Sequence, residues 1–300
     1  MDSPSLHRRS ALLAAGYTER ELRRWLRTGE LSMLRRGNYL AGAPPEQAHA
    51  RHRLLVQAAF AELGPGVVAS HASAAVLHDL PTWAVALDRV SVTRDRRSGG
   101  RRHRLVHVRT ARLAPDEVVQ LDGRAVTSVA RTLVDLARTA SFESAVVTAD
   151  AALATGAVDA EELAESVRRV DRWPGCPAAR RVIGFVDGGA ESVGESRSRV
   201  AIERAALPAP VTQWQVRDGA GRPVARVDFG WPERNVVGEF DGEIKYGRLV
   251  GPDRSPGDVV FEEKLREDEL RALGLMVVRW TWADLADFTA VARRLHRALL

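Results

Sequence analysis

The 300-residue sequence contains a single cysteine, Cys176, and no apolar run of membrane-spanning length. One cysteine excludes an intramolecular disulfide framework and a cysteine-based zinc site. The apolar stretch at residues 11–16 is too short for the core of a signal peptide. We also find no internal repeat and no Gly-rich phosphate loop. These absences favour a cytoplasmic protein in a reducing compartment.

Lysine is scarce, so arginine supplies most of the 44 basic residues that face 39 acidic ones and give a net charge of +5. The isoelectric point near 10.0 is a modest argument for an anionic partner. The arginine guanidinium group can bind phosphate through two hydrogen bonds, but a genome of high GC content also encodes arginine-rich, lysine-poor proteins. The length and a hydrophobic content of 45% predict two or three folded domains.

Two alternating apolar runs, at 224–229 and 236–241, are separated by a Trp-Pro-Glu-Arg-Asn stretch that cannot continue a strand. This pattern predicts a β-hairpin. With the turn centred in that stretch, Asp228 lies opposite Glu239 or the residue before it. Glu239 and Asp241 are two residues apart and project from the same face of their strand.

Acidic side chains among Val and Phe are costly unless a cation neutralises them, because like charges repel and burial disfavours the ionised form. A divalent metal ion supplies that charge, and oxygen-only ligands suit Mg²⁺ or Mn²⁺. Lys245 comes four residues after Asp241, close enough to orient or deprotonate an attacking water. The sequence therefore predicts a magnesium or manganese site at the end of this hairpin.

These residues resemble the PD-(D/E)XK nucleases, in particular their very-short-patch-repair-like branch. That family places a metal-binding Asp after one apolar strand and Glu-x-Lys, or a variant of it, at the end of the next. Asp228 matches the first acid and Glu239 the second, whereas Asp241 stands where the usual lysine would be. Members of this branch have Glu-x-Asp-Gly followed a few residues later by His or Lys, and Lys245 stands at that position. The resemblance implies Asp228, Glu239 and Asp241 as metal ligands and Lys245 as a catalytic residue, with Lys264 in reserve.

A further acid of this family comes from a helix before the hairpin, and Glu195 within residues 191–199 resembles it. After the hairpin, a helix expected over 259–273 and a strand over 275–280 resemble the closing elements. The resemblance covers about residues 190–286. It implies an α/β restriction-endonuclease-like domain with a mixed sheet, in which Glu195 also serves catalysis and metal binding.

Ordinary turn chemistry is the alternative explanation for this pattern, since an Asp and an Asp-Gly commonly end neighbouring strands. Taken singly, each acid is expected to be solvated. Taken together with Glu195, Lys245 and the flanking helix in the right order, the acids favour a nuclease site. Asp241 in the lysine position leaves open a degenerate or purely structural nuclease fold.

The N-terminal forty residues predict two short helices and two strands. A helix over 5–16 closes at Gly16, and a capping box at residues 18–21 opens a second helix that ends at Gly29. Residues 31–40 predict two strands about an Arg-Gly-Asn turn. This order is that of a winged helix-turn-helix.

One face of the second helix is apolar and the other is basic. The stretch resembles the N-terminal domain of abortive-infection type IV antitoxins, which carry Gly-Glu-Leu and Arg-Arg-Gly-x-Tyr in this position. The resemblance implies that the second helix enters the DNA major groove and that the wing lies on the backbone. The DNA contacts it implies are Arg20, Arg23, Arg24, Arg27, Arg35 and Arg36. The alternative is a protein-contact module with a solvated arginine stripe.

Residues 46–170 predict helices and a few strands, again resembling those antitoxins and without recognisable chemistry. His71 and His78 are seven residues apart and lack an acid at zinc-protease spacing, so core or capping roles are expected for them. The basic loop at 94–104 either contacts phosphates or is solvated. The Pro- and Gly-containing segment 171–177 is the best linker candidate.

The sequence thus predicts an N-terminal α+β region followed by an α/β restriction-endonuclease-like domain. The regions are a winged helix-turn-helix (1–43), an antitoxin-like α+β middle region (46–170), a linker with a short helix (171–189) and a PD-(D/E)XK-like domain (190–300) ending in a helix over 283–299.

The expected function is DNA binding with Mg²⁺- or Mn²⁺-dependent endonuclease activity, in defence or DNA repair. The competing hypothesis is a non-enzymatic, antitoxin-like transcriptional regulator. Duplex DNA is the expected partner and a membrane is not. A cognate toxin, a homodimer and an RNA substrate stay open.

Overall fold

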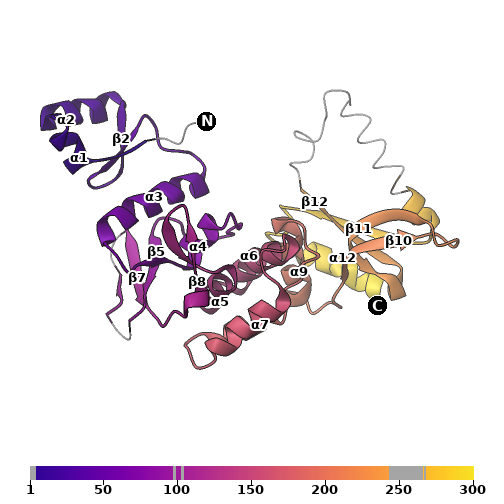
Figure 1. Ribbon diagram of the computed structural model, residues 1–300. Coiled ribbons are helices and arrows are strands. Elements are labelled where there is room, and N and C mark those ends of the chain that lie inside the picture. Colours follow the sequence, from indigo (N-terminus) through magenta and orange to yellow (C-terminus); the bar gives the residue numbers. More distant parts are fainter. Residues whose placement is uncertain (1–4, 97–98, 103–104, 243–265, 267) are drawn as a thin grey trace. The chain divides into compact units, whose positions relative to one another are not determined.

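The computed structural model describes residues 5–96, 99–102, 105–242, 266 and 268–300. The chain divides into two compact units, one formed by residues 1–144 and 158–181 and the other by residues 145–157 and 182–300. Both units mix helices and strands, as the expected α+β character requires (Figure 1). Within the described ranges, no helix combines the length and the apolar character needed to cross a membrane.

The first unit begins with a small three-stranded sheet of order β1-β3-β2. Its elements are β1 (Leu6–Arg8), α1 (Arg9–Ala14), α2 (Glu19–Thr28), β2 (Leu31–Arg35) and β3 (Asn38–Ala41). The predicted capping box is confirmed, because the Thr18 hydroxyl accepts from the Glu21 amide and the Glu21 carboxylate accepts from the Thr18 amide at 2.7 Å. Gly29 ends α2 in the left-handed conformation. The apolar face of α2 packs on Leu31 and Tyr39.

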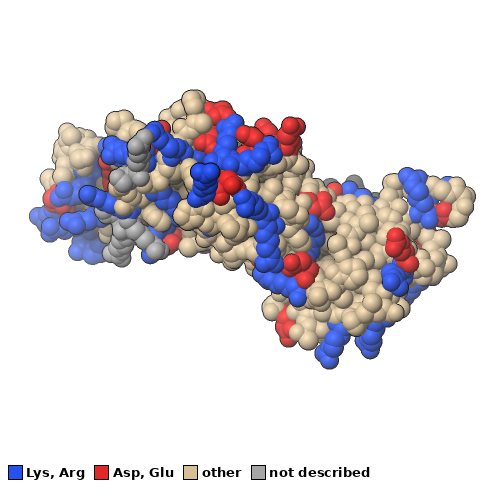
Figure 2. All heavy atoms as spheres, turned by 90° about the horizontal axis from the view of Figure 1, so that it is seen from below, with Lys and Arg blue, Asp and Glu red and all other residues tan. Residues whose placement is uncertain are grey.

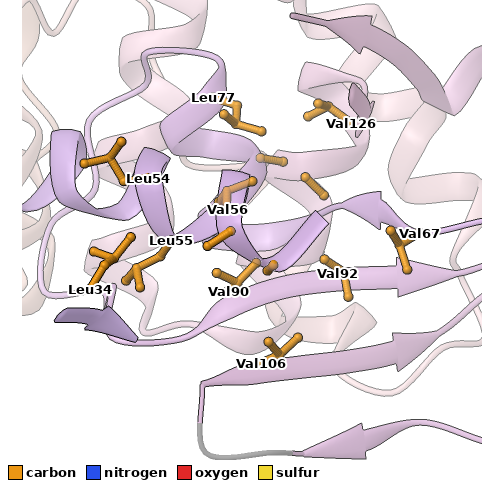
Figure 3. Packing of buried hydrophobic residues seen from close by; sticks show 14 of the residues in the cluster. Leu34, Leu54, Leu55, Val56, Val67, Leu77, Val90, Val92, Val106 and Val126 are labelled. Atoms are coloured by element: carbon orange, nitrogen blue, oxygen red, sulfur yellow. The ribbon is translucent and has the colours of Figure 1, made fainter. Parts of the chain in front are cut away.

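A mixed six-stranded sheet of order β6-β7-β5-β4-β9-β8 forms the centre of the first unit. The strands are β4 (Val68–Ala69), β5 (Val90–Arg94), β6 (Arg101–Arg102), β7 (Val106–Thr110), β8 (Val118–Leu121) and β9 (Arg124–Thr127). Helices α3 (Ala48–Leu63) and α4 (His71–Leu77) supply apolar side chains to its core. In Figure 3, Val56 of α3 lies above Val90 of β5, and Leu55 lies beside Leu34 of β2. This core fixes the two helices against the strands.

The remaining helices of the middle of the chain follow the sheet. They are α5 (Val129–Thr139), α6 (Phe142–Ala154), α7 (Ala160–Arg169) and α8 (Cys176–Ile183), with the 3-10 turn η1 (Pro115–Glu117) before β8. His78 is the half-buried C-cap residue of α4, and its Nε2 lies 2.7 Å from the Thr127 carbonyl oxygen, in agreement with the expected core or capping role. The buried Arg131 pairs with both Glu117 and Asp135 at 2.9 Å.

The second unit is built on a four-stranded sheet of order β10-β11-β12-β13. Its elements are α9 (Val193–Arg204), β10 (Val211–Arg217), β11 (Pro223–Trp231), the 3-10 turn η2 (Pro232–Arg234), β12 (Val236–Asp241), β13 (Met276–Thr281) and α12 (Thr289–Leu299). The pairs β10–β11 and β11–β12 are antiparallel and β12–β13 is parallel. Apolar side chains of α9 and α12 pack on the sheet, and Figure 1 shows the two helices beside the strands. The mixed sheet agrees with expectation.

Four local expectations need correction. Residues 6–8 form a strand rather than a helix, because they pair with β3. The final helix begins at Thr289 rather than at residue 283. Strand β10 was not expected. The expected linker at 171–177 lies inside the first unit, where Cys176 is buried and the Arg131 guanidinium lies 4.8 Å from the Trp173 ring.

Candidate functional site

The predicted hairpin is confirmed as β11 and β12 joined by η2. The two strands pair from Phe229 opposite Gly238 to Trp231 opposite Val236. Asn235 closes the turn with a left-handed φ of 53°, a conformation that Asn adopts more readily than most residues. Continuing the register by one residue brings Asp228 level with Glu239. The acids therefore lie on adjacent strands at the end of the paired region.

Asp228 is half-buried, and its carboxylate is fixed by the neighbouring strand. Its Oδ2 accepts a hydrogen bond of 2.8 Å from the backbone amide of Phe240. A side-chain carboxylate thus bonds to an amide of β12 just past the last paired residue. This contact orients Asp228 toward the strand that carries Glu239.

Glu195 sits in the first turn of α9 and is buried, with 8% of its surface exposed. Its Oε1 accepts from the Ser192 hydroxyl at 2.7 Å. Its Oε2 accepts from the Glu191 amide at 2.9 Å and from the Gln213 side-chain amide at 2.8 Å. Three donors therefore hold the carboxylate in one orientation.

Electrostatics connect Glu195 to Asp228. Burial raises the pKa of Glu195 above its usual range, and the negative charge of Asp228 raises that pKa further against the opposing hydrogen bonds. The strand register also places the two residues near each other, because Gln213, which donates to Glu195, stands between the pairs Thr212–Phe229 and Trp214–Val227 and is therefore level with Asp228. The structure thus brings together two of the acids that the sequence singled out, from a helix and a strand.

Two backbone features support this arrangement. Gln213 has a φ of 50° in the middle of β10, where the pairing with β11 passes from Thr212 directly to Trp214. Such a conformation is strained for a residue other than glycine and persists only where its surroundings enforce it. Gly194 lies against the ring of Phe240, and a Cβ at this position would overlap that ring. Helix α9 can therefore approach β12 closely.

Glu239 has a different environment from the other acids. It is buried, and its Oε1 lies 2.5 Å from an Arg266 guanidinium nitrogen while its Oε2 lies 2.9 Å from one of Arg279. Arg279 is the parallel partner of Glu239 in β13. Both carboxylate oxygens are therefore neutralised by arginine. In these contacts Glu239 does not fit the role of a metal ligand.

The other predicted site residues are only partly placed. Asp241 ends β12, half-buried and in register with Thr281. Lys245 and Lys264 lie outside the described residues. Within the part of the chain that the structure describes, no group of three or more His, Cys, Asp or Glu side chains is placed to hold a metal ion.

The predicted DNA contacts fall into two groups. Arg20, Arg23, Arg24, Arg27 and Arg36 are exposed on α2 and at the β2–β3 turn. Arg35 is mostly buried, and its guanidinium lies 2.8 Å from Glu62 of α3. Arg35 therefore anchors β2 on α3 and is not available to a phosphate. In the view of Figure 2, Lys and Arg side chains are more crowded over the first unit than over the second.

Three residues of the site were missed by the sequence analysis: Gln213, Arg266 and Arg279. Arg279 had a usable signal, since it interrupts the apolar strand Met-Val-Val-Arg-Trp and a charge there needs a partner. Gln213 had a weaker one, as a polar residue in Val-Thr-Gln-Trp-Gln-Val. Arg266 had none, because a charged helix is ordinarily solvated.

Comparison with known proteins gives distant relatives. No protein-family model matches the chain. Two curated relatives, the uncharacterized proteins MT2308 and Rv2248 from two strains of Mycobacterium tuberculosis, are each 32% identical over 159 residues, or 53% of this chain and 55% of theirs. The chain thus spans about half the length of the curated relatives it matches. The crystal structure of the RV2827C protein from Mycobacterium tuberculosis is similar with a TM-score of 0.39 and 17% identity, covering 72% of this chain and 85% of that one.

Proposed function

We propose that the second unit is a metal-dependent endonuclease of the PD-(D/E)XK kind, in its very-short-patch-repair-like branch. The observation that carries the proposal is geometric: Gln213 of β10 donates to the Glu195 carboxylate and stands level with Asp228 of β11 in the strand register. Burial raises the pKa of Glu195, and the charge of Asp228 adds to that effect. Placing two carboxylates of like charge close together in a partly buried site lowers stability, so the presence of both Asp228 and Glu195 favours a functional role that uses both. The hairpin position of Asp228 supports the same reading.

The donor chemistry of Asp228 and Glu195 fits a hard divalent cation. Mg²⁺ is commonly held in proteins by one or two carboxylates together with substrate phosphate oxygens and water. A cation held by these carboxylates would also offset the charge of Asp228, which adds to the burial that raises the pKa of Glu195. When bound, Mg²⁺ or Mn²⁺ would supply positive charge for water activation and for the developing charge on phosphate.

The chain's own residues prepare this site. Ser192 and Gln213 orient the Glu195 carboxylate, and the Phe240 amide orients Asp228. Arg266 is half-exposed beside Glu239, where a guanidinium can also contact a scissile phosphate. Lys245, which the family resemblance assigns to the attacking water, stays a prediction outside the described residues.

The N-terminal elements supply the proposed nucleic-acid surface. We propose a winged helix-turn-helix in which α2 enters the major groove and the β2–β3 turn lies on the backbone. Exposed Arg23, Arg24 and Arg27 along α2 and Arg36 at the turn support it. Arg35 is left out, because it is paired with Glu62.

The test is cleavage of labelled duplex DNA, single-stranded DNA and RNA under single-turnover conditions with Mg²⁺ or Mn²⁺. We expect cleavage that chelator stops and that Asp228→Asn and Glu195→Gln each reduce about 100-fold or more. Glu233→Gln, an exposed acid in the turn of the same hairpin, is the matched control and should cleave like the parent.

Metal binding gives a second readout that does not depend on turnover. Titration with Mn²⁺ should show one site in the parent and in Glu233→Gln, and none of equal affinity in Asp228→Asn. Lys245→Met should bind the metal but not cleave. Cleavage that persists in both carboxamide variants would assign the activity to another site or protein.

A second candidate function is an antitoxin-like transcriptional regulator whose nuclease fold is structural. The ion pairs of Glu239 with Arg266 and Arg279 favour it, since a second-strand acid already neutralised has no need of a metal. Sequence-specific duplex binding by a parent protein that cleaves none of the three substrates would support this function over the first.

A further inference from the structure

A pocket of about 300 Å³ lies in the first unit, away from every residue assigned above. Its lining comes from α4, from β5 and β7, and from the segments around residues 84–89 and 136–144. Its polar lining residues include His71, Arg89, Ser91, His107, Arg109 and Asp88. Two arginines and two imidazoles thus face a single acid, and that acid lies 3.7 Å from one of the arginines, Arg89.

His71 is the unusual residue of this lining. It is 5% exposed, and its φ of 54° is one that a histidine rarely adopts. Ala84, on another segment of the same lining, has a φ of 50°. Strained backbone of this kind is found disproportionately at ligand sites. The chain therefore holds two opposite parts of one pocket in costly conformations.

Hydrogen bonding orients the ring of His71. The Thr93 hydroxyl donates to the Ser70 hydroxyl oxygen at 2.8 Å, and that oxygen lies 3.0 Å from Nδ1 of His71. A hydroxyl oxygen can accept two hydrogen bonds and donate one, so Ser70 can pair with Nδ1 in either tautomer. Among the described residues, Nε2 makes no hydrogen bond. The Nε2 side of a mostly buried imidazole thus belongs to the lining of the pocket.

The charge around this ring is positive. Burial holds the pKa of His71 well below its usual range, and Arg109, Arg138, Arg131 and His107 lower it further. The imidazole is therefore neutral near pH 7, and in its Nε2–H tautomer it can donate to an acceptor in the pocket. Arg109 also reaches the pocket hydroxyl of Ser91, at 3.3 Å.

We propose that this pocket binds the phosphoryl group of a small phosphorylated ligand no larger than a mononucleotide. A phosphoryl group offers several strong acceptor oxygens, which match an arginine fork, a neutral imidazole N–H and serine hydroxyls. The volume lies at the lower end of the range of about 300–1,000 Å³ for small-molecule pockets. Duplex DNA would need an extended binding surface, so this pocket does not suit it.

The experiment uses the full chain, with inorganic phosphate and AMP as probes and adenosine as the uncharged comparison. Binding is followed by calorimetry and by phosphorus NMR. We expect one site for phosphate, competition by AMP and none by adenosine. Arg109→Met should weaken binding about 10-fold or more. Arg112→Met, an exposed arginine of the same unit, should change nothing.

His71→Asn tests the imidazole separately, because Asn tolerates the positive φ and lacks the imidazole Nε2 that lines the pocket. It should weaken phosphate binding about 5-fold or more while leaving the thermal unfolding midpoint within a few degrees. The nuclease variant Asp228→Asn should bind phosphate like the parent, which keeps this proposal separable from the proposed function. Equal binding by Arg109→Met and the parent, or no binding of phosphate and AMP, would overturn it. Displacement of phosphate by a short oligonucleotide but not by AMP would do so too.

Discussion

Gln213 connects Asp228 to Glu195: its side-chain amide donates to the Glu195 carboxylate, and its position in β10 is level with Asp228 of β11. The Asp228 carboxylate is held by an amide of β12, and that of Glu195, in the first turn of α9, is held by three donors. Their repulsion is a measurable property of the folded chain. It provides a readout of the candidate site before any substrate is known.

Asp228→Asn should lower the pKa of Glu195 relative to the parent, because the variant removes the like charge and leaves the burial. The pKa should still exceed the usual value, since burial is the larger cause. Adding Mg²⁺ to the parent should also lower it, and should do so less in the variant. Carboxyl-detected NMR titration measures both changes. An unchanged pKa of Glu195 in Asp228→Asn would show that the carboxylates are not coupled.

Stability should depend on pH through Glu195. Its pKa is raised in the folded state, so between the unfolded value of about 4.3 and the folded pKa the folded chain binds more protons. This contribution to stability is fully present below about pH 4.3 and is lost as pH rises through the folded pKa. Denaturant unfolding of the parent and of Glu195→Gln at several pH values isolates it. A parent-to-variant difference that grows with rising pH would contradict the sign.

Glu239→Gln should destabilise the second unit by about 1–3 kcal/mol, because the buried carboxylate serves two guanidinium groups. Its partners are partly exposed, at 40% for Arg266 and 28% for Arg279, so water limits the loss. Glu239→Gln combined with Arg279→Met should cost less than the sum of the single changes. Chemical denaturation of the three variants and the parent gives the coupling. If the losses in the free energy of unfolding of the two single variants add up fully in the double variant, the ion pair of Glu239 with Arg279 does not contribute to stability.

Neutralising Arg23, Arg24 and Arg27 together should weaken duplex DNA binding and flatten its dependence on salt. Each lost phosphate contact lowers the slope of log K against log salt by about 0.9. A matched triple change at exposed or half-exposed arginines of the same unit, Arg112, Arg124 and Arg168, should leave that slope closer to the parent's. Fluorescence anisotropy over a salt series measures it. Equal slopes for the two triples would make α2 a protein-contact helix.

Thr18→Ala should cost about 1 kcal/mol in the N-terminal part of the first unit, because it deletes the cap of α2. Thr18→Ser keeps an oxygen in the same place and should cost less. Hydrogen exchange at the amides of α2 reports the local loss. A loss of equal size in the serine variant would point to the methyl group of Thr18 in place of its hydroxyl.

Features set by neighbouring residues were predictable from the sequence. The capping box at Thr18, the end of α2 at Gly29 and the hairpin of β11 and β12 rest on turn chemistry and periodicity of short stretches of sequence. The alternation of Glu239 and Asp241 follows from the strand alone. These local structures do not depend on residues far away in the sequence, so the structure has them as the sequence predicts.

Features set by distant partners were not predictable. β1 is a strand only because β3 lies beside it, and its own sequence favours a helix. The parallel pairing of β12 with β13 brings Arg279 to Glu239 across forty residues of chain, and α3 brings Glu62 to Arg35. Spacing could identify the acids, but it could not show which of them already have a cation.

The positive φ of Gln213 has a second consequence, at the boundary of the sheet. β10 is an outer strand of the order β10-β11-β12-β13, and such strands expose amides and carbonyls to strands of other molecules. The left-handed residue interrupts the regular row of these groups at mid-strand. The residue whose side-chain amide donates to Glu195 therefore also makes this edge a poor template for strands of other molecules. A substitution at Gln213 that restores a regular extended backbone in β10 is expected to promote aggregation and to remove the hydrogen bond to Glu195.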